Sequence, residues 1–367
     1  MQKKLLRKDL AGMEKQREQL PDVLKGFAIV MVVLGHCIQE GSGEAFSTQW
    51  LYFYDRLYQF IYSFHMPLFM MVSGYLCGGS VQRAASKEMR IQLLKRRILT
   101  LLVPVFFWTA AECFHRLILT SAPERTALER VFTFFYSALN NFWFLWAVFW
   151  CFLIVYVMHY YLKDNVAIYG IGFLLLFFIP DGLGLGAYKY MMPYFIASFY
   201  GYGFIRQNAG RLRKWTKLPF VVIMGIVFAA LFCFFDANSL IYLTGYKLIG
   251  KDVVRQLGID GYRLVIGFVG SCFFILLWHV ILEQFPFMGK FWMFLGNDTM
   301  GIYILSGYLI IFVVKPLSNF AEPSYLLNVM EMVPVLLASW GLAHLIGKVP
   351  VLGYVVGKAK RCAKPQE

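Results

Sequence analysis

The sequence predicts an all-α integral membrane protein with about ten transmembrane helices and both termini in the cytoplasm. Three observations support this fold class. Hydrophobic residues make up 59% of the 367 residues and charged residues only 15%, whereas an ordinary soluble domain has about 25% charged residues. The chain also contains a series of apolar segments long enough to cross a bilayer. Finally, basic residues recur on alternate connections between these segments, as expected for loops on the cytoplasmic side.

The apolar segments follow one another with short connections. A scan for about 20 mainly apolar residues places them at 23–40, 57–78, 95–117, 142–162, 165–180, 189–206, 217–235, 262–283, 299–315 and 330–347. No internal repeat or long linker interrupts them, and the small-residue pattern of a cleaved signal peptide does not follow the first. We therefore expect one membrane domain over 23–347, between a cytoplasmic tail, 1–22, and a basic cytoplasmic tail, 348–367.

The formal net charge of +14 is attributed to the membrane and not to nucleic acid. The basic residues cluster in both tails and in the second and sixth connections, where they would meet anionic lipid headgroups. The connections around 40–56, 119–140 and 316–329 are more acidic or mixed, while 236–261 fits the alternation less well. We expect a multi-pass protein of the cell (cytoplasmic) membrane, with the lipid bilayer as a partner and no nucleic acid.

The seven cysteines lie singly, and all but Cys362 fall in or beside apolar stretches. They are interpreted as buried small hydrophobic residues and not as disulfides. The sequence contains no CxxC, no HExxH and no paired metal-ligand spacing. No metal site is therefore predicted.

The most informative stretch runs from Asp22 through Lys25 to His36. Lys25 and His36 would share one helical face, about 20° apart around the axis and about 16 Å apart along it. Asp22 precedes Lys25 by one helical turn, close enough to pair with it. Ionisable groups inside a membrane usually face a cavity or a partner. His36 could take a proton from an attacking hydroxyl, or it could simply bond a backbone carbonyl of a neighbouring helix, and helix geometry leaves both interpretations open.

Further motifs accompany this helix. They are Phe64-His65-Met66-Pro67-Leu68-Phe69 with Ser73-Gly74-Tyr75, the basic run Lys95-Arg96-Arg97-Ile98 before Pro104, and, more weakly, Trp143-Phe144-Leu145 and Gly301-Ile302-Tyr303-Ile304. Together they resemble the acyltransferase type 3 family of membrane O-acyltransferases, especially its fucose 4-O-acetylase-like branch. The resemblance spans most of the chain, although only the first three motifs are specific.

The resemblance implies a cytoplasmic acyl-CoA donor and transfer to a carbohydrate or similar hydroxyl. It places the catalytic role on His36 and a donor-holding role on Lys25. The family often has arginine at the second position, and a lysine offers phosphate a point charge in place of a bidentate fork. Many members also have a histidine where this chain has Ser306, so a role for a histidine at that position is not carried over.

The donor site is expected at the cytoplasmic mouth. Asp22, Lys25, Lys95, Arg96 and Arg97 are candidates for binding coenzyme A phosphates, whereas the basic run could instead anchor lipid headgroups.

Other residues extend the predicted site toward the acceptor. His65 precedes Pro67, which can free backbone carbonyls, and His65 could approach His36 from an antiparallel helix as a second catalytic histidine or could serve packing. Acceptor-binding candidates are Glu112, Trp143 and Asn141. Snorkelling of Glu112 to water and an interfacial aromatic belt are the alternatives for this group.

The sequence thus predicts an O-acyltransferase that uses acetyl-CoA, or another acyl-CoA, to modify a cell-surface glycan, glycolipid or related acceptor. His36 would act as the general base or as the acyl carrier. The alternative is a transporter or flippase for a lipid-linked sugar, because buried charges and broken helices also mark transport paths.

Overall fold

The computed structural model describes residues 2–41, 51–119, 126–140, 142–177, 186–241, 252–318 and 323–358, and its regular structure within these ranges is entirely helical. Each of the ten predicted apolar segments falls on a helix. These helices are α1 (Gln2–Gly41), α3 (Arg56–Arg83), α4 (Lys87–Leu119), α6 (Trp143–Tyr161), α7 (Val166–Phe177), α8 (Gly186–Gln207), α10 (Leu218–Cys233), α11 (Val253–Gln284), α13 (Thr299–Ser318) and α14 (Tyr325–Lys348).

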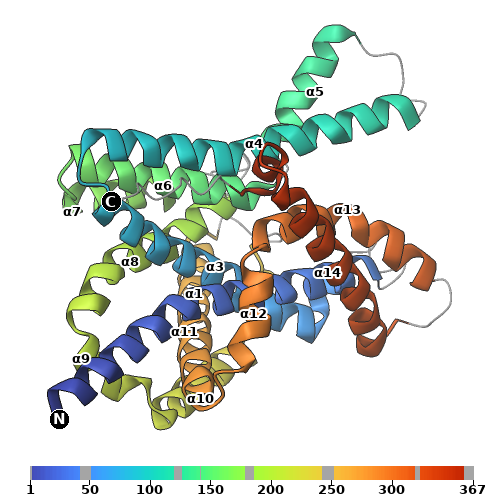
Figure 1. The fold of residues 1–367 in the computed structure, drawn as a ribbon. Helices are drawn as coiled ribbons and strands as arrows, with labels where there is room; N and C mark the ends of the chain where they lie inside the picture. Colours follow the sequence, from blue (N-terminus) through green and yellow to red (C-terminus); the bar gives the residue numbers. More distant parts are fainter. Residues whose placement is uncertain are drawn as a thin grey trace.

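Shorter elements connect these helices. They are α5 (Ala127–Asn140), α9 (Ala209–Leu212), α12 (Met288–Gly296) and the 3-10 turns η1 (Leu51–Tyr54), η3 (Arg213–Thr216), η4 (Ala237–Ser239) and η5 (Leu352–Val356). Figure 1 shows how the long helices cross one another around α1 and α3.

Length and apolar composition qualify six of the described helices as membrane spans, or up to eight if each of two bent helix pairs forms one span. The bent pairs are α9 to η3 with α10, at 66°, and α12 with α13, at 71°. α7 has 12 residues and is short for a span, and α8 mixes apolar residues with Lys189 and several tyrosines. The helical fold is confirmed for the described residues, and several of its helices are long and apolar enough to cross a membrane. Ten spans and cytoplasmic termini stay predictions.

α3 is the central helix of the bundle and packs against α8, α1 and α11. Its contact with α8 depends on glycine, because a methyl group at Gly74 would lie 2.9 Å from the carbonyl carbon of Phe195 and closer to its oxygen. α1 packs in turn against α3, α12, α13 and α14. α1 and α3 are therefore held as neighbours by helices from both halves of the chain.

The C-terminal part of α4 and the following α5 project from the bundle (Figure 1). α5 exposes several large apolar side chains, for example Leu128 at 79% exposed and Phe132 at 71%. The indole of Trp146 donates to the Ala138 carbonyl over 2.7 Å and ties α5 to α6. In a membrane these apolar side chains would contact lipid.

Candidate functional site

The Asp22–Lys25 pair forms as predicted, with 2.7 Å between the Lys25 ammonium and the Asp22 carboxylate. Both side chains are partly accessible, at 25% and 35% exposed. The main chain beside them is in close contact with α12, since a methyl group at Gly26 would collide with the Trp292 carbonyl and one at Gly296 with the Asp22 carbonyl. The position of the ion pair is therefore determined by this close crossing of α1 and α12.

His36 lies on α1 and His65 on α3, and these two helices pack against each other. His36 lies within electrostatic range of His65. The main chain next to His36 is close to α3, because a methyl group at Gly35 would lie 2.9 Å from the Tyr62 ring. The Tyr62 ring in turn packs edge-on to the His65 ring, with 4.6 Å between centroids. Tyr62 thus lies between the α1 backbone at Gly35 and the His65 ring, and the roles of the two histidines stay predictions.

The hydrogen bond of His65 determines its tautomer. Nδ1 of His65 lies 2.7 Å from the Ile61 carbonyl oxygen within α3. A carbonyl oxygen can only accept, so Nδ1 must carry the proton, and Nε2 of the neutral ring keeps its lone pair. His65 is buried, at 2% exposed, whereas His36 is partly accessible. In this tautomer Nε2 of His65 can only accept a hydrogen bond or a proton.

The two weaker motifs meet beside this pair of helices. The ring of Tyr303 on α13 lies 5.9 Å from the ring of Phe144 on α6, and Phe144 lies 5.5 Å from Phe69 on α3. The Tyr303 hydroxyl interacts with the Phe144 backbone and is within electrostatic range of Tyr62. Ser306 is fully buried and donates to the Tyr303 carbonyl over 3.2 Å.

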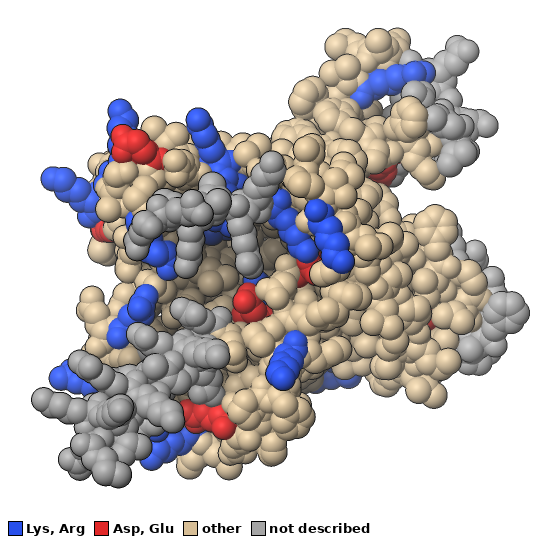
Figure 2. Space-filling view, in the orientation of Figure 1, with Lys and Arg blue, Asp and Glu red and all other residues tan. Residues whose placement is uncertain are grey.

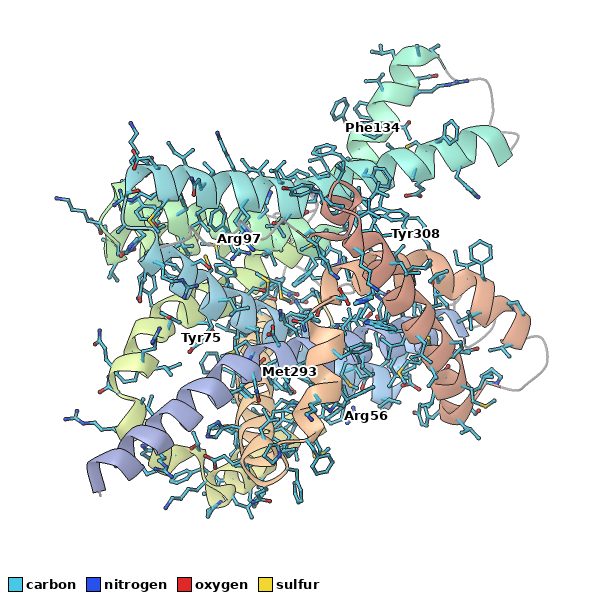
Figure 3. All side chains as sticks on the ribbon, in the orientation of Figure 1. Arg56, Tyr75, Arg97, Phe134, Met293 and Tyr308 are labelled. Carbon is cyan, nitrogen blue, oxygen red and sulfur yellow. The ribbon has the colours of Figure 1, made fainter. Side chains whose placement is uncertain are left out.

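The basic run on α4 separates into outward and inward side chains. Lys95 and Arg96 are exposed, whereas Arg97 is partly buried. The Arg97 guanidinium lies 5.7 Å from the centroid of the Phe152 ring on α6 and within electrostatic range of Cys77 on α3. Figure 3 shows Arg97 beneath α4, and Figure 2 shows basic side chains around a hollow in the same region. Arg97 is the member of the run that faces other helices.

Two of the three predicted acceptor residues lie in the described part of the chain, Glu112 on α4 and Trp143 on α6. Glu112 lies toward the C-terminal end of α4, the part that projects toward α5 (Figure 1). Trp143 is the first residue of α6, with its ring 6.2 Å from that of Phe144. Asn141 lies outside the described residues. Trp143 is therefore the acceptor candidate that the structure places nearest the Phe144 and Tyr303 rings.

A pocket between α3, α8, η4 and α11 was not anticipated. Its lining includes Tyr62, Lys189, Asp260 and Arg263 and does not include Lys25 or His36. All three charged residues are at least 94% buried. The sequence could have indicated two of these buried residues, because Asp260 and Arg263 form an i, i+3 pair of opposite charge at the start of an apolar run. A passage from Lys25 to His36 stays a prediction.

Glu331 on α14 is a second buried acid that the sequence analysis did not single out. Its side chain is fully buried, and neither carboxylate oxygen has a hydrogen-bond partner among the residues that the structure describes. It lies against Gly41 at the end of α1 and within electrostatic range of Cys37. Cys37 directly follows His36, so this carboxyl group lies in the neighbourhood of the histidine pair.

Comparisons with known proteins agree with this architecture. Residues 20–347 match the sequence model of the acyltransferase 3 family, which is described as an acyltransferase domain. The chain is 30% identical over 217 residues to nodulation protein NolL of Mesorhizobium japonicum, a match that covers 58% of this chain and 54% of that protein.

A second relative is nodulation protein NolL of Sinorhizobium fredii, 35% identical over 140 residues. That match covers 36% of this chain and 34% of the relative. The chain thus spans about half or less of the length of these two curated relatives. No solved structure matches significantly.

Proposed function

Because this chain belongs to the acyltransferase 3 family, we propose that it moves an acyl group, in the simplest case acetyl, from acyl-CoA to a hydroxyl. The proposed donor is cytoplasmic acetyl-CoA, and the proposed acceptor is a cell-surface glycan, glycolipid or related molecule. The protein would act in the cell (cytoplasmic) membrane. The observation that carries the proposal is the packing of α1 on α3 beside His36, where the Tyr62 ring contacts the His65 ring and lies against Gly35.

The proposed reaction uses His36 to activate the acceptor. As a general base, its imidazole takes the hydroxyl proton while the oxygen attacks the thioester carbonyl. The C–S bond then breaks, the ester remains on the acceptor, and coenzyme A leaves as a thiol with the proton. As an acyl carrier, His36 attacks the thioester itself, releases coenzyme A and passes the acyl group to the acceptor in a second step. His65, with Nδ1–H held by Ile61, would accept a hydrogen bond through Nε2 in either case.

The proposed donor site uses cations for the phosphates of coenzyme A. Arg97 is partly buried against α6 and offers a planar fork suited to phosphate. Lys25 contributes a point charge, and Asp22 keeps it in place through their ion pair. Lys95 and Arg96 are exposed and would act at the rim, either on phosphate or on lipid headgroups.

The test measures transfer from radiolabelled acetyl-CoA by the purified full-length protein in lipid nanodiscs, with a membrane glycan extract as acceptor. We expect His36→Ala to lose roughly 10²-fold or more in rate, as removal of a general base does. His159→Ala is the matched control, because His159 pairs with Asp164 over 2.7 Å at the far end of α6. Equal transfer by the two variants would contradict the role of His36.

Substitution of His65 by asparagine and by glutamine separates a chemical role of its ring from a packing role. His65→Asn can keep the donor to the Ile61 carbonyl but lacks a group at the Nε2 position, whereas His65→Gln reaches that position. If Nε2 acts in the reaction, we expect His65→Gln to retain more activity than His65→Asn; the reverse order would indicate a structural role.

Two further measurements distinguish the mechanisms and the transport alternative. Rapid quenching without acceptor would trap a labelled, hydroxylamine-sensitive protein if His36 carries the acyl group. Movement of a labelled lipid-linked sugar across vesicles without acyl-CoA, together with no acetyl transfer, would favour a flippase and contradict the proposal.

A further inference from the structure

The pocket between α3, α8, η4 and α11 combines buried charge with aromatic walls. Lys189, Asp260 and Arg263 line it at 5%, 1% and 6% exposed. Buried ionisable groups in a membrane protein are costly and usually serve a ligand, an ion path or a fixed partner. The bonds made by each group decide which of these applies.

Arg263 is committed to the protein itself. Its Nε donates to the Ser239 carbonyl over 2.8 Å, and Nη2 donates to the carbonyls of Asn238 and Leu240 over 2.8 and 3.0 Å. Nη1 donates to Oδ1 of Asp260 over 2.9 Å. These bonds hold η4 and the following residues against α11. Arg263 therefore builds the pocket wall and leaves little donor capacity for a ligand.

Asp260 has capacity left. Oδ1 accepts from both Arg263 and Gln256, each over 2.9 Å. Oδ2 is buried and has no hydrogen-bond partner among the residues that the structure describes. An unsatisfied buried carboxylate oxygen is costly, and a donor that reaches it through the pocket would remove that cost. A ligand hydroxyl is such a donor.

The remaining lining has the chemistry that recognises a sugar ring. Tyr62, Tyr190 and Tyr194 supply aromatic surface of the kind that packs on the C–H face of a pyranose. Pro67 lacks an N–H group, so the Ser63 carbonyl one turn earlier does not receive its usual helical hydrogen bond. Both residues line the pocket. A cation, Lys189, can donate to ring or hydroxyl oxygens. Donors, acceptors and flat apolar surface thus occur together, as a polyhydroxylated ligand requires.

The pocket adjoins the histidine pair. Tyr62 lines the pocket and also packs on the His65 ring at 4.6 Å. On α3 the lining residues lie in the N-terminal half, away from Arg83 and the basic run on α4. A ligand in the pocket would therefore reach the histidines from the end opposite the proposed donor site.

We propose that this pocket binds a sugar unit of the acceptor, with Asp260 Oδ2 accepting a hydrogen bond from a sugar hydroxyl. The statement that the sugar belongs to the acceptor rests on the proposed function, but sugar binding can be measured without catalysis. In the proposed topology the pocket faces away from the cytoplasm, so donor and acceptor enter from opposite sides.

The test is saturation-transfer NMR on the full-length protein in nanodiscs, with methyl glucoside, methyl fucoside and methyl N-acetylglucosaminide as probes. We expect transfer to the ring protons of at least one glycoside for the wild type. Asp260→Asn keeps an oxygen for Arg263 but removes the charge, and we expect about a tenfold weaker affinity from losing a charged hydrogen bond. Asp164→Asn is the matched control, since Asp164 binds Tyr200 outside the pocket.

Folding is monitored by size-exclusion profile and by saturation transfer to coenzyme A. Should Asp260→Asn misfold, Tyr190→Phe replaces it, because that change removes only a hydroxyl and keeps the ring that Lys189 and Arg263 contact; we then expect a weaker glycoside signal.

The outcomes separate the two proposals. Equal glycoside affinity in the wild type and the folded variant, or no transfer to any glycoside in the wild type, overturns the sugar pocket. Glycoside binding that depends on Asp260 supports the pocket even if no acetyl transfer is detected, a result that would count against the proposed function alone.

Discussion

A methyl group added at Gly26 tests whether the close crossing of α1 and α12 positions the Lys25 ammonium. In Gly26→Ala the new methyl would lie 2.8 Å from the carbonyl carbon of Trp292 and closer still to its oxygen. Real Cβ atoms essentially never approach within 3.0 Å, so the two helices must separate. Lys25 is adjacent in sequence and would move with α1.

The magnitude follows from two opposing effects. Overpacking a tight contact lowers the free energy of unfolding by about 1–3 kcal/mol. We expect the upper end of this range here, because the clash is with main-chain atoms and no side chain can rotate away. Replacing glycine by alanine inside a helix raises the free energy of unfolding by about 1 kcal/mol. The net expected loss is about 2 kcal/mol. Gly341→Ala on α14 is the control, because nothing lies within 4 Å of its added methyl, so only the gain in helix propensity remains.

Thermal unfolding in detergent and acetyl-CoA kinetics measure the two consequences. We expect Gly26→Ala to melt several degrees below Gly341→Ala and to raise the KM for acetyl-CoA several-fold, with a smaller change in kcat. Equal melting temperatures and equal KM values in the two variants would refute the argument that this crossing positions the donor site.

Three further predictions concern charged groups. Arg97→Ala should raise the KM for acetyl-CoA about tenfold by loss of a phosphate fork, while Lys95→Ala, exposed at the rim, should change it much less; equal effects would argue for a general surface charge. Asp298 is buried and pairs with Lys358, so Asp298→Asn should speed proteolysis after α14, and an unchanged cleavage rate would contradict a holding role. Glu331→Gln should raise the melting temperature, because an unpaired buried carboxyl costs about 1 kcal/mol or more; a lower temperature would show that the acid has a partner.

The helices were largely predictable because a bilayer imposes a minimum apolar length. All ten predicted segments fall on helices, and the Asp22–Lys25 pair forms because its spacing alone places both side chains on one face. The bend between α12 and α13 was not predicted, since it arises at a short break between two apolar stretches. The projection of α5 was likewise missed, because 119–140 was interpreted as a connection.

The candidate site was predictable only for residues that lie on the same helix. The packing of α1 on α3 agrees with the prediction that these two helices are neighbours. The pocket was not predictable, because Lys189, Asp260 and Tyr62 come from three separate helices. In addition, a hydropathy scan cannot distinguish a buried lysine at the start of a helix from a lysine that binds lipid headgroups. The meeting of these three residues depends on the packing of α3 between α8 and α11.

The contact between Gly26 and Gly296 also limits how this chain can vary. Each glycine faces a carbonyl group of the other helix, and every amino acid carries that group. A substitution elsewhere cannot make room, because there is no opposing side chain to shorten. In a saturation library, selection at either codon should enrich glycine strongly, with alanine the mildest replacement, and second-site suppressors should act only by shifting a whole helix.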